Sequence, residues 1–387
     1  MTGMGGIAAI AGVGLVQHKR GHAPWPERGL LVQAILQACD DAGFDPALVD
    51  GFVTYGDDKN EPVRLMSDLG TRELRWAGQV FGGGGGGICG TFSQAVAAIA
   101  TGQARAVIVY RALAQNHSGR LSEAVMAHHL NGHLMGAGLV APAQVCAMRA
   151  QRMIEKAGVP RATIKAFVKA CAYHGERNPD AVTYGEPFDE RAYDEARLIA
   201  EPFRLLDCSR ENDGAGALLV VGAGEARNLK QTPVHILGAA HGAAQGWGDL
   251  LENDDDDQYA TGGFRSVARQ LWTMTGLSPA DIDVAQIYEN FSAQGVASLI
   301  DHGFCTPEEA GDFIRFENLI APNGKIPVNT AGGNLTQGFI HGIGIPIEAV
   351  RQLRGQSSNP VPGAETCLVA GGPGAPIVSS AIFSNTL

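Results

Sequence analysis

The chain has 387 residues, of which 45% are hydrophobic and 18% charged, and its formal net charge is -11. A chain of this length and apolar content can bury a large core and corresponds to two or three domain-sized units. The negative charge, without a basic stripe, excludes a nucleic-acid surface, and no apolar run reaches the roughly 20 residues of a membrane helix. The start of the chain has no signal-peptide pattern, which predicts a cytoplasmic protein.

The first part of the chain alternates between strand and helix patterns. Residues 7–13 form an apolar run typical of a buried strand, and residues 27–42 have helical periodicity that ends before Gly43. Residues 49–54 predict the next strand. This alternation is typical of an α/β fold.

A run of six glycines at 82–87 is the most unusual local feature. It precedes a helical pattern that ends near Gly102, and residues 106–110 then predict a buried strand. Backbone N–H groups at such a loop-to-helix junction can face a ligand. The glycine run therefore predicts a binding loop.

Residues 112–199 differ from their surroundings, because they are helical and polar. Residues 143–157 and 161–174 have amphipathic periodicity, which predicts a helical insertion over one face. Four aspartates at 254–257 predict a solvated loop rather than a metal site.

The strand and helix alternation returns near the end of the chain. Residues 285–288 predict a strand, and residues 293–302 and 345–353 predict helices. Two α/β halves therefore flank the insertion. The seven cysteines are scattered without a CxxC or Cys/His cluster, so we expect neither disulfides nor a metal site on this chain.

Several short motifs follow one another in an order that is specific although each alone is weak. They are HGERNPDA at 174–181, IAEP at 199–202, DGAGA at 213–217, YENF at 288–291, NTAGG at 329–333 and AGGPG at 370–374. Together they resemble the thiolase superfamily, in the branch of sterol carrier protein X and bacterial lipid-transfer-type thiolases. The resemblance covers nearly the whole chain.

The resemblance implies a thiolase fold, which is an α/β fold with duplicated αβα halves in a five-layered αβαβα arrangement. The N-terminal half is expected at 1–225, including the insertion at about 112–199, and the C-terminal half at 226–387. Thiolase-like folds are usually dimers about a two-fold axis, so the resemblance also implies a homodimer.

The groups that a thiolase uses for acyl transfer are missing from their expected positions. A thiolase needs a nucleophilic cysteine, a histidine that activates it, and a second cysteine that moves the proton. The family spacing places Gly85 at the nucleophile, while Cys89 lies about one helical turn later. Phe339 stands where the motif histidine belongs, and Leu368 stands at the second cysteine. Cys367 is one step away, which in a strand points to the other face.

The pattern looks like the thiolase-like aldolases that shorten steroid side chains. Tyr288 matches a tyrosine of that group, and FIHG at 339–342 and EAVRQLRG at 348–355 repeat its signature except that Phe339 replaces a tyrosine. The resemblance implies retro-aldol cleavage of a β-hydroxyacyl-coenzyme A to a ketone and propionyl-CoA or acetyl-CoA. Tyr288 is the candidate base, although a free phenol titrates near pKa 10 and must be shifted to act so.

A proton donor other than residue 339 is then needed unless Tyr288 acts alone. His341 is the nearest ionisable side chain in the sequence, and its alternative role is structural, at the start of the following helix. Arg111, next to Tyr110 in a predicted buried strand, could orient the site. Backbone groups predicted to form the oxyanion hole or contact substrate lie at Gly85, Gly86, Asn329, Gly332, Gly333, Phe339, Gly371 and Gly372.

Two other functions remain open at this point. One is a thiolase or acyltransferase that uses Cys89 or Cys367, and the other is a non-catalytic acyl-CoA-binding subunit of a complex. The resemblance implies no intrinsic cofactor beyond the coenzyme A thioester substrate. It also implies a small OB-fold partner whose zinc ribbon would carry any zinc.

Overall fold

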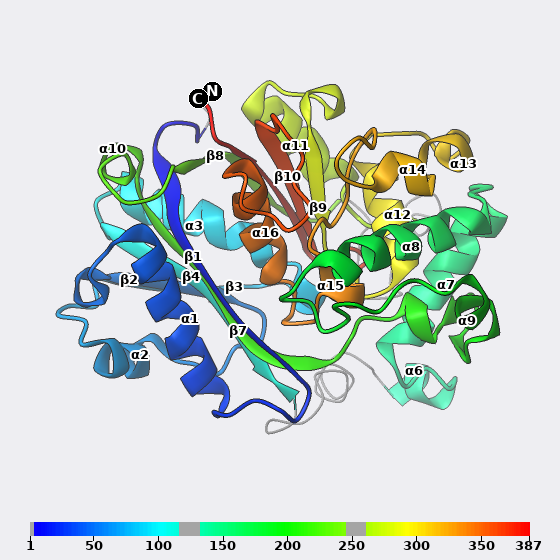
Figure 1. Cartoon of the computed structure of the whole chain (residues 1–387), viewed down its shortest axis with the longest axis horizontal. Helices are drawn as coiled ribbons and strands as arrows, with labels where there is room; N and C mark the ends of the chain where they lie inside the picture. Colours follow the sequence, from blue (N-terminus) through cyan, green and yellow to red (C-terminus); the bar gives the residue numbers. More distant parts are fainter. Residues whose placement is uncertain (1–3, 116–131, 245–260) are drawn as a thin grey trace.

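The computed structural model describes residues 4–115, 132–244 and 261–387 (Figure 1). The aspartates at 254–257 and residues 116–131 of the insertion lie outside the described residues. Among the described helices, none is long and apolar enough to cross a membrane.

The N-terminal half alternates between strands and helices. Its elements are β1 (Ala8–Lys19), α1 (Glu27–Ala42), β2 (Gly51–Tyr55), α2 (Pro62–Leu69), β3 (Trp76–Val80), α3 (Ile88–Ala100), β4 (Ala106–Ala114), β7 (Asn212–Gly222) and the short α10 (Ala223–Ala226). The predicted helix at 27–42 is confirmed with the same bounds, and it ends because Gly43 takes the left-handed conformation and its N–H caps the Asp40 carbonyl.

Two predicted strands are longer than the sequence indicated. β1 extends to Lys19 and β4 to Ala114, since both pair with β7 to its beginning, at Lys19–Asn212 and Ala114–Asp213. Hydrogen bonds to a neighbouring strand stabilise these ends, and such pairing is not visible in hydrophobic periodicity.

The insertion and the C-terminal half complete the chain. The insertion contains α6 (Gly132–Gly136), α7 (Pro142–Glu155), α8 (Arg161–Arg177), α9 (Glu190–Glu195), β5 (Leu198–Ala200) and β6 (Phe203–Arg204), which lie together on one side of the molecule (Figure 1). The C-terminal half contains β8 (Val234–Gly242), α11 (Arg265–Thr275), β9 (Val284–Ile287), α12 (Ser292–Asp301), α13 (Ala310–Phe313), α14 (Phe316–Leu319), α15 (Gly333–Thr336), α16 (Gly344–Leu353), β10 (Thr366–Gly371) and β11 (Val378–Ser384).

The strands form one continuous sheet in the order β3-β2-β4-β7-β1-β8-β11-β10-β9. The two halves join where β1 and β8 pair at Ala9–His235 and Ile10–Val234. Each half repeats the same order of elements, and Val328 forms an isolated parallel bridge to β9 at the place that β3 occupies beside β2. This repeat supports the division near residue 225, which we propose on that basis.

The strands of the two halves lie on either side of two central helices, and further helices cover their outer faces, which makes five layers. The helices α3 and α16 lie in the middle and contact strands of both halves, while α1 covers the N-terminal strands and α11 the C-terminal ones. Three separate clusters of buried apolar residues fill the spaces between these layers. The thiolase arrangement is therefore confirmed, and the loops that follow β3, β9 and β10 meet near its centre.

Candidate active site

The glycine run occupies the junction between β3 and α3, as the sequence predicts. Its backbone is left-handed at Gly84 and Gly85, with φ of 55° and 84°. A Cβ atom added to Gly85 would lie 2.4 Å from Cε2 of Tyr288. The tyrosine ring therefore fills the space that a side chain at the expected nucleophile position would need.

A second glycine lies against the same Cδ2–Cε2 edge of the ring. A Cβ atom at Gly342 would lie 2.4 Å from Cδ2 of Tyr288. Such distances essentially never occur for real Cβ atoms, so both positions must lack a side chain while the ring keeps its place. The two loops that precede α3 and α16 thus both pack against this edge of the Tyr288 ring.

The four glycines predicted for the oxyanion hole come together. A Cβ atom at Gly372 would lie 2.3 Å from the Cα of Gly86, and one at Gly371 would lie 3.0 Å from the Gly85 carbonyl oxygen. Only backbone without side chains can approach so closely. The Gly86 N–H already donates to the Gly83 carbonyl at 3.0 Å, so this amide is not open to a ligand.

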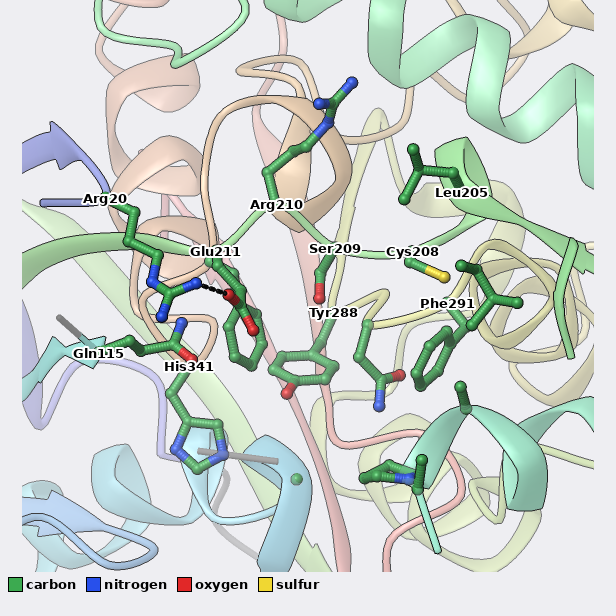
Figure 2. A pocket seen from close by; sticks show the side chains of 17 residues that line it. Arg20, Gln115, Leu205, Cys208, Ser209, Arg210, Glu211, Tyr288, Phe291 and His341 are labelled. Atoms are coloured by element: carbon green, nitrogen blue, oxygen red, sulfur yellow. Dashed lines mark hydrogen bonds and ion pairs between the residues drawn. The ribbon is translucent and has the colours of Figure 1, made fainter. Parts of the chain in front are cut away.

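A cavity of about 610 Å³ opens above these loops, between the insertion and the two halves (Figure 2). At its inner end the rings of Tyr288, Phe339 and His341 lie edge to face, with centroids 5.9–6.5 Å apart. The structure therefore brings both predicted catalytic residues and Phe339 to one place. The lining residues are Arg20, Gly84, Gln115, Ala141, Pro142, Ala143, Ile199, Leu205, Cys208, Ser209, Arg210, Glu211, Tyr288, Asn290, Phe291, Phe339 and His341.

Tyr288 follows the last residue of β9, where its N–H donates to the Ala370 carbonyl at 2.8 Å. The side chain is almost fully buried. Burial raises the pKa of Tyr288 well above 10, the Glu289 carboxylate adds to this rise, and the Arg111 charge opposes it. The resting side chain is therefore the neutral phenol.

His341 lies in the loop before α16 with a φ of 50° and is buried. Burial lowers the pKa of His341 well below 6.5, and the positive charge of Arg111 lowers it further. The imidazole is neutral across the physiological range. Its Nδ1 accepts a hydrogen bond from Nε of Arg111 at 3.0 Å, so Arg111 does contact the site as its sequence position suggested.

Of the residues predicted to form the oxyanion hole or contact substrate, only Phe339 belongs to the described cavity wall, and three of the others lie near the end of β9 and Glu289. The side chain of Asn329 accepts from the Ile287 N–H at 2.6 Å and donates to the Ile287 carbonyl at 2.9 Å. A Cβ atom at Gly333 would lie 2.0 Å from Oε1 of Glu289, and one at Gly332 would lie 2.9 Å from the Gly175 Cα. These residues hold the end of β9, and we propose that they act on substrate only through Tyr288.

Glu289 is a fully buried carboxyl group whose Oε2 has no hydrogen-bond partner among the described residues. Its Oε1 accepts from the Leu335 N–H at 3.2 Å. Burial raises the pKa of Glu289 from 4.5 to about 8. The folded protein thus holds a proton here that the unfolded chain releases, and the stability this contributes is present below pH 4.5 and lost as pH rises through 8.

We therefore expect the free energy of unfolding to decrease less between pH 5 and pH 8 in Glu289→Gln than in the wild type, because an amide does not ionise. Urea denaturation at three pH values measures this. Glu186→Gln, at an exposed position, should keep the wild-type slope. Equal slopes for wild type and Glu289→Gln would exclude Glu289 as the group responsible.

The two cysteines considered as alternative nucleophiles are poorly placed for that role. Cys89 is buried in α3, its Sγ lies 3.4 Å from the Val369 carbonyl oxygen, and burial raises its pKa to about 12. Cys367 points to the opposite face of β10 from Leu368, and burial raises its pKa well above 9. A thiol that remains protonated is a weak nucleophile.

We expect iodoacetamide at neutral pH to leave Cys89 unmodified in the native protein, because its thiol is both inaccessible and protonated. Cys89→Ser should retain activity within about threefold for the same reason. Turnover after alkylation and mass spectrometry of the labelled cysteines are the measurements. An acyl group trapped on Cys89 or Cys367 would contradict this expectation.

The cavity entrance contains charged residues that the sequence analysis missed. Arg20 Nη1 lies 2.8 Å from Oε2 of Glu211, and both side chains are about one-third exposed (Figure 2). They meet because the end of β1 pairs with the beginning of β7. No local motif marks either residue, so only the strand register shows that they are neighbours. Among the described residues, no group of three possible metal ligands occurs.

Comparisons with known proteins agree with this geometry. A family model described as "Thiolase C-terminal domain-like" matches residues 246–384. The chain is 36% identical over 381 residues to the 17-hydroxy-3-oxo-4-pregnene-20-carboxyl-CoA lyase of Mycobacterium tuberculosis, covering 96% of this chain and 98% of that protein. It is 35% identical over 394 residues to the steroid side-chain-cleaving aldolase of Thermomonospora curvata, covering 97% of each. The solved "Ltp2-ChsH2(DUF35) aldolase" matches with a TM-score of 0.91 and 35% identity over 99% of both chains.

The fold and the comparisons together define an enzyme of the thiolase superfamily, and in this chain a tyrosine ring fills the space beside Gly85. The chain belongs to the thiolase-like aldolases, which are carbon–carbon lyases.

Proposed function

We propose that this chain cleaves a β-hydroxyacyl-coenzyme A, with a steroid side-chain thioester as the substrate class, to a ketone and propionyl-CoA or acetyl-CoA. The observation that carries the reaction type is the Tyr288 ring against Gly85, since it puts an acid–base group where an acyl-cysteine would form. The substrate class is supported by the activities for which two relatives are named, a pregnene carboxyl-CoA lyase and a steroid side-chain-cleaving aldolase.

The proposed reaction needs no covalent intermediate. In its phenolate form, which is the minor form at neutral pH, Tyr288 takes the proton from the β-hydroxyl. The β-carbon to oxygen bond becomes a carbonyl, and the bond between the α- and β-carbons breaks. Its electron pair moves into the thioester as an enolate, and Tyr288 returns the same proton to the α-carbon. Atoms and charges balance, and the free phenolate is regenerated.

The enolate needs hydrogen-bond donors near its oxygen. We propose that backbone around Gly85, Gly371 and Gly372 provides this site, because these loops touch one another directly beside Tyr288. The Gly86 amide is engaged within its own turn and is not included. The phosphates of coenzyme A would then lie toward the entrance, where Figure 2 shows the Arg210 guanidinium pointing away from Tyr288.

Partners belong to the proposal as well. The solved aldolase is named for two components, Ltp2 and ChsH2(DUF35). We propose that this chain also works with a small second protein, an OB-fold partner that carries any zinc, and that it forms a homodimer in the cytoplasm. Size-exclusion chromatography with light scattering, with and without the partner, tests both contacts.

The test of the activity is product analysis. The purified protein, alone and with the small partner protein, is incubated with the coenzyme A thioester of a tertiary β-hydroxy steroid acid. We expect the ketone and the short acyl-CoA in equal amounts by liquid chromatography and mass spectrometry. Acyl-CoA binding without any cleavage, even with the partner present, would instead support a non-catalytic subunit. Thiol-dependent release of acyl-CoA would support an acyltransferase.

A further inference from the structure

Asp58, Arg111 and His341 form a continuous chain of buried polar contacts that leads to the cavity. Nη1 of Arg111 lies 3.1 Å from Oδ2 of Asp58, and both side chains are at most 2% exposed. Nε of Arg111 donates to Nδ1 of His341 at 3.0 Å. The three residues come from the loop after β2, from β4 and from the loop before α16, so only the folded chain assembles them.

Donors other than Arg111 also hold the Asp58 carboxylate in place. Its Oδ2 accepts from the Ala112 N–H at 3.0 Å, and its Oδ1 accepts from the Asn60 N–H at 2.8 Å and from the Asn60 side chain at 2.9 Å. These bonds hold a buried carboxylate beside β4. The guanidinium of Arg111 is thereby held in one orientation.

The contact with Arg111 decides which nitrogen of His341 carries the proton. Arginine has only donors, so Nδ1 of His341 must offer its lone pair and the proton of the neutral ring must be on Nε2. Nε2 is buried and has no hydrogen-bond partner within the described part of the chain. His341 lines the cavity, and its ring lies 6.5 Å from that of Tyr288, centroid to centroid.

The imidazole has little freedom to turn away. The Tyr55 hydroxyl donates to the His341 carbonyl at 2.8 Å, and the Tyr55 ring lies 5.8 Å from the imidazole. On the other side, a Cβ atom at Gly56 would lie 3.1 Å from Cε1 of His341. Figure 2 shows the imidazole facing the region where the Tyr288 hydroxyl ends.

We propose that Arg111, anchored by Asp58, is a positioning residue that fixes His341 as the Nε2–H tautomer, so that Nε2–H donates to the β-oxygen of the substrate. This rests on the proposed retro-aldol function. As the β-hydroxyl loses its proton to Tyr288, negative charge develops on the β-oxygen, and a fixed donor stabilises it. His341 keeps its proton throughout, and the role is the one a second phenol at position 339 would fill.

The charged and titratable groups that contact the imidazole are consistent with a ring that stays neutral. Arg111 is the adjacent charge, and its ion pair with Asp58 neutralises it. Burial raises the pKa of the phenols of both Tyr55 and Tyr288, so these phenols are neutral as well. We therefore expect no step in the pH dependence of kcat/KM from His341 between pH 5.5 and 8.

Nitrogen-15 NMR of histidine-labelled protein tests the tautomer without any turnover. His341, assigned by comparison with His341→Gln, should show a protonated Nε2 and an unprotonated Nδ1 from pH 5.5 to 8.5. A protonated Nδ1, or a titration near 6.5, would overturn the proposal. Because this readout needs no substrate, its failure is distinct from failure of the proposed reaction.

A variant tests the role of the pair in catalysis. Arg111→Met alone leaves the buried Asp58 unpaired and is expected to destabilise the fold, so it is combined with Asp58→Asn. In the double variant we expect kcat to decrease about 10- to 100-fold with KM within about twofold, and the His341 resonances to show both tautomers. A folded double variant with the wild-type kcat, or one that retains a single Nε2–H tautomer, would contradict the proposal.

Discussion

Replacing Tyr288 by phenylalanine is expected to lower kcat by about a thousandfold, because a general acid or base contributes between about 10² and 10⁴ in rate. The ring that packs against Gly85 and Gly342 is kept, so only the hydroxyl is lost. The free energy of unfolding should therefore stay within about 1 kcal/mol of the wild type. Steady-state kinetics and urea denaturation of the same preparation give both values.

The matched control is Tyr110→Phe. Tyr110 is also a fully buried phenol, but its hydroxyl donates to the Asn60 carbonyl and lies outside the described cavity wall. We expect this variant to lose about 1 kcal/mol of stability and to keep its kcat. Full activity in Tyr288→Phe would remove Tyr288 from the reaction and leave His341 as the candidate.

The pH dependence separates the two directions in which Tyr288 could transfer a proton. Its pKa is raised well above 10 by burial, so the phenolate is the minor form at neutral pH. If the phenolate is the active form, kcat/KM rises about tenfold per pH unit up to pH 10. A profile that is flat over this range would show that the phenol acts as an acid and that another group accepts the hydroxyl proton.

Gly85→Ala is expected to cause the second large loss, at least a hundredfold in kcat together with about 2–4 kcal/mol of stability. Two effects add. The alanine must adopt a φ near 84°, and its Cβ must displace the Tyr288 ring that lies 2.4 Å away. A displaced ring no longer holds its hydroxyl beside the substrate. Kinetics and denaturation measure the two losses separately.

Gly102→Ala isolates the backbone effect. Gly102 has a φ of 70°, and a Cβ there would meet no atom within 4 Å. This variant should lose about 1 kcal/mol and retain its activity. In a double-mutant cycle, Tyr288→Ala should remove most of the stability loss caused by Gly85→Ala, since the space is then open. Additive losses would contradict the packing of the ring against Gly85.

Two features of the candidate site can be predicted from single residue types in the sequence. The missing cysteine at Gly85 and the tyrosine at 288 are both visible in motifs, and the structure places them in contact. The sequence was less informative for Asn329, whose motif position suggested substrate contact. Both polar atoms of its side chain bind the Ile287 backbone, because the end of β9 needs partners that a motif cannot reveal.

The secondary structure shows the same difference between features that local sequence reveals and features that depend on distant contacts. Both ends of helix α1 could be predicted from the sequence, because its apolar face and Gly43 are local signals. The ends of β1 and β4 could not, since they depend on pairing with β7. Asp58 and Glu211 carry no local signature, and only strand register and layer packing place them beside Arg111 and Arg20.

The sequence by itself therefore determined that this chain has two halves with an α/β pattern, a glycine loop without a nucleophile, and a tyrosine in an aldolase-like motif. Only the tertiary structure decided that the Tyr288 ring fills the space beside Gly85 and that Arg111 reaches His341. The physical reason is that these contacts join residues far apart in the chain. Their energies depend on how five layers pack, which local periodicity does not encode.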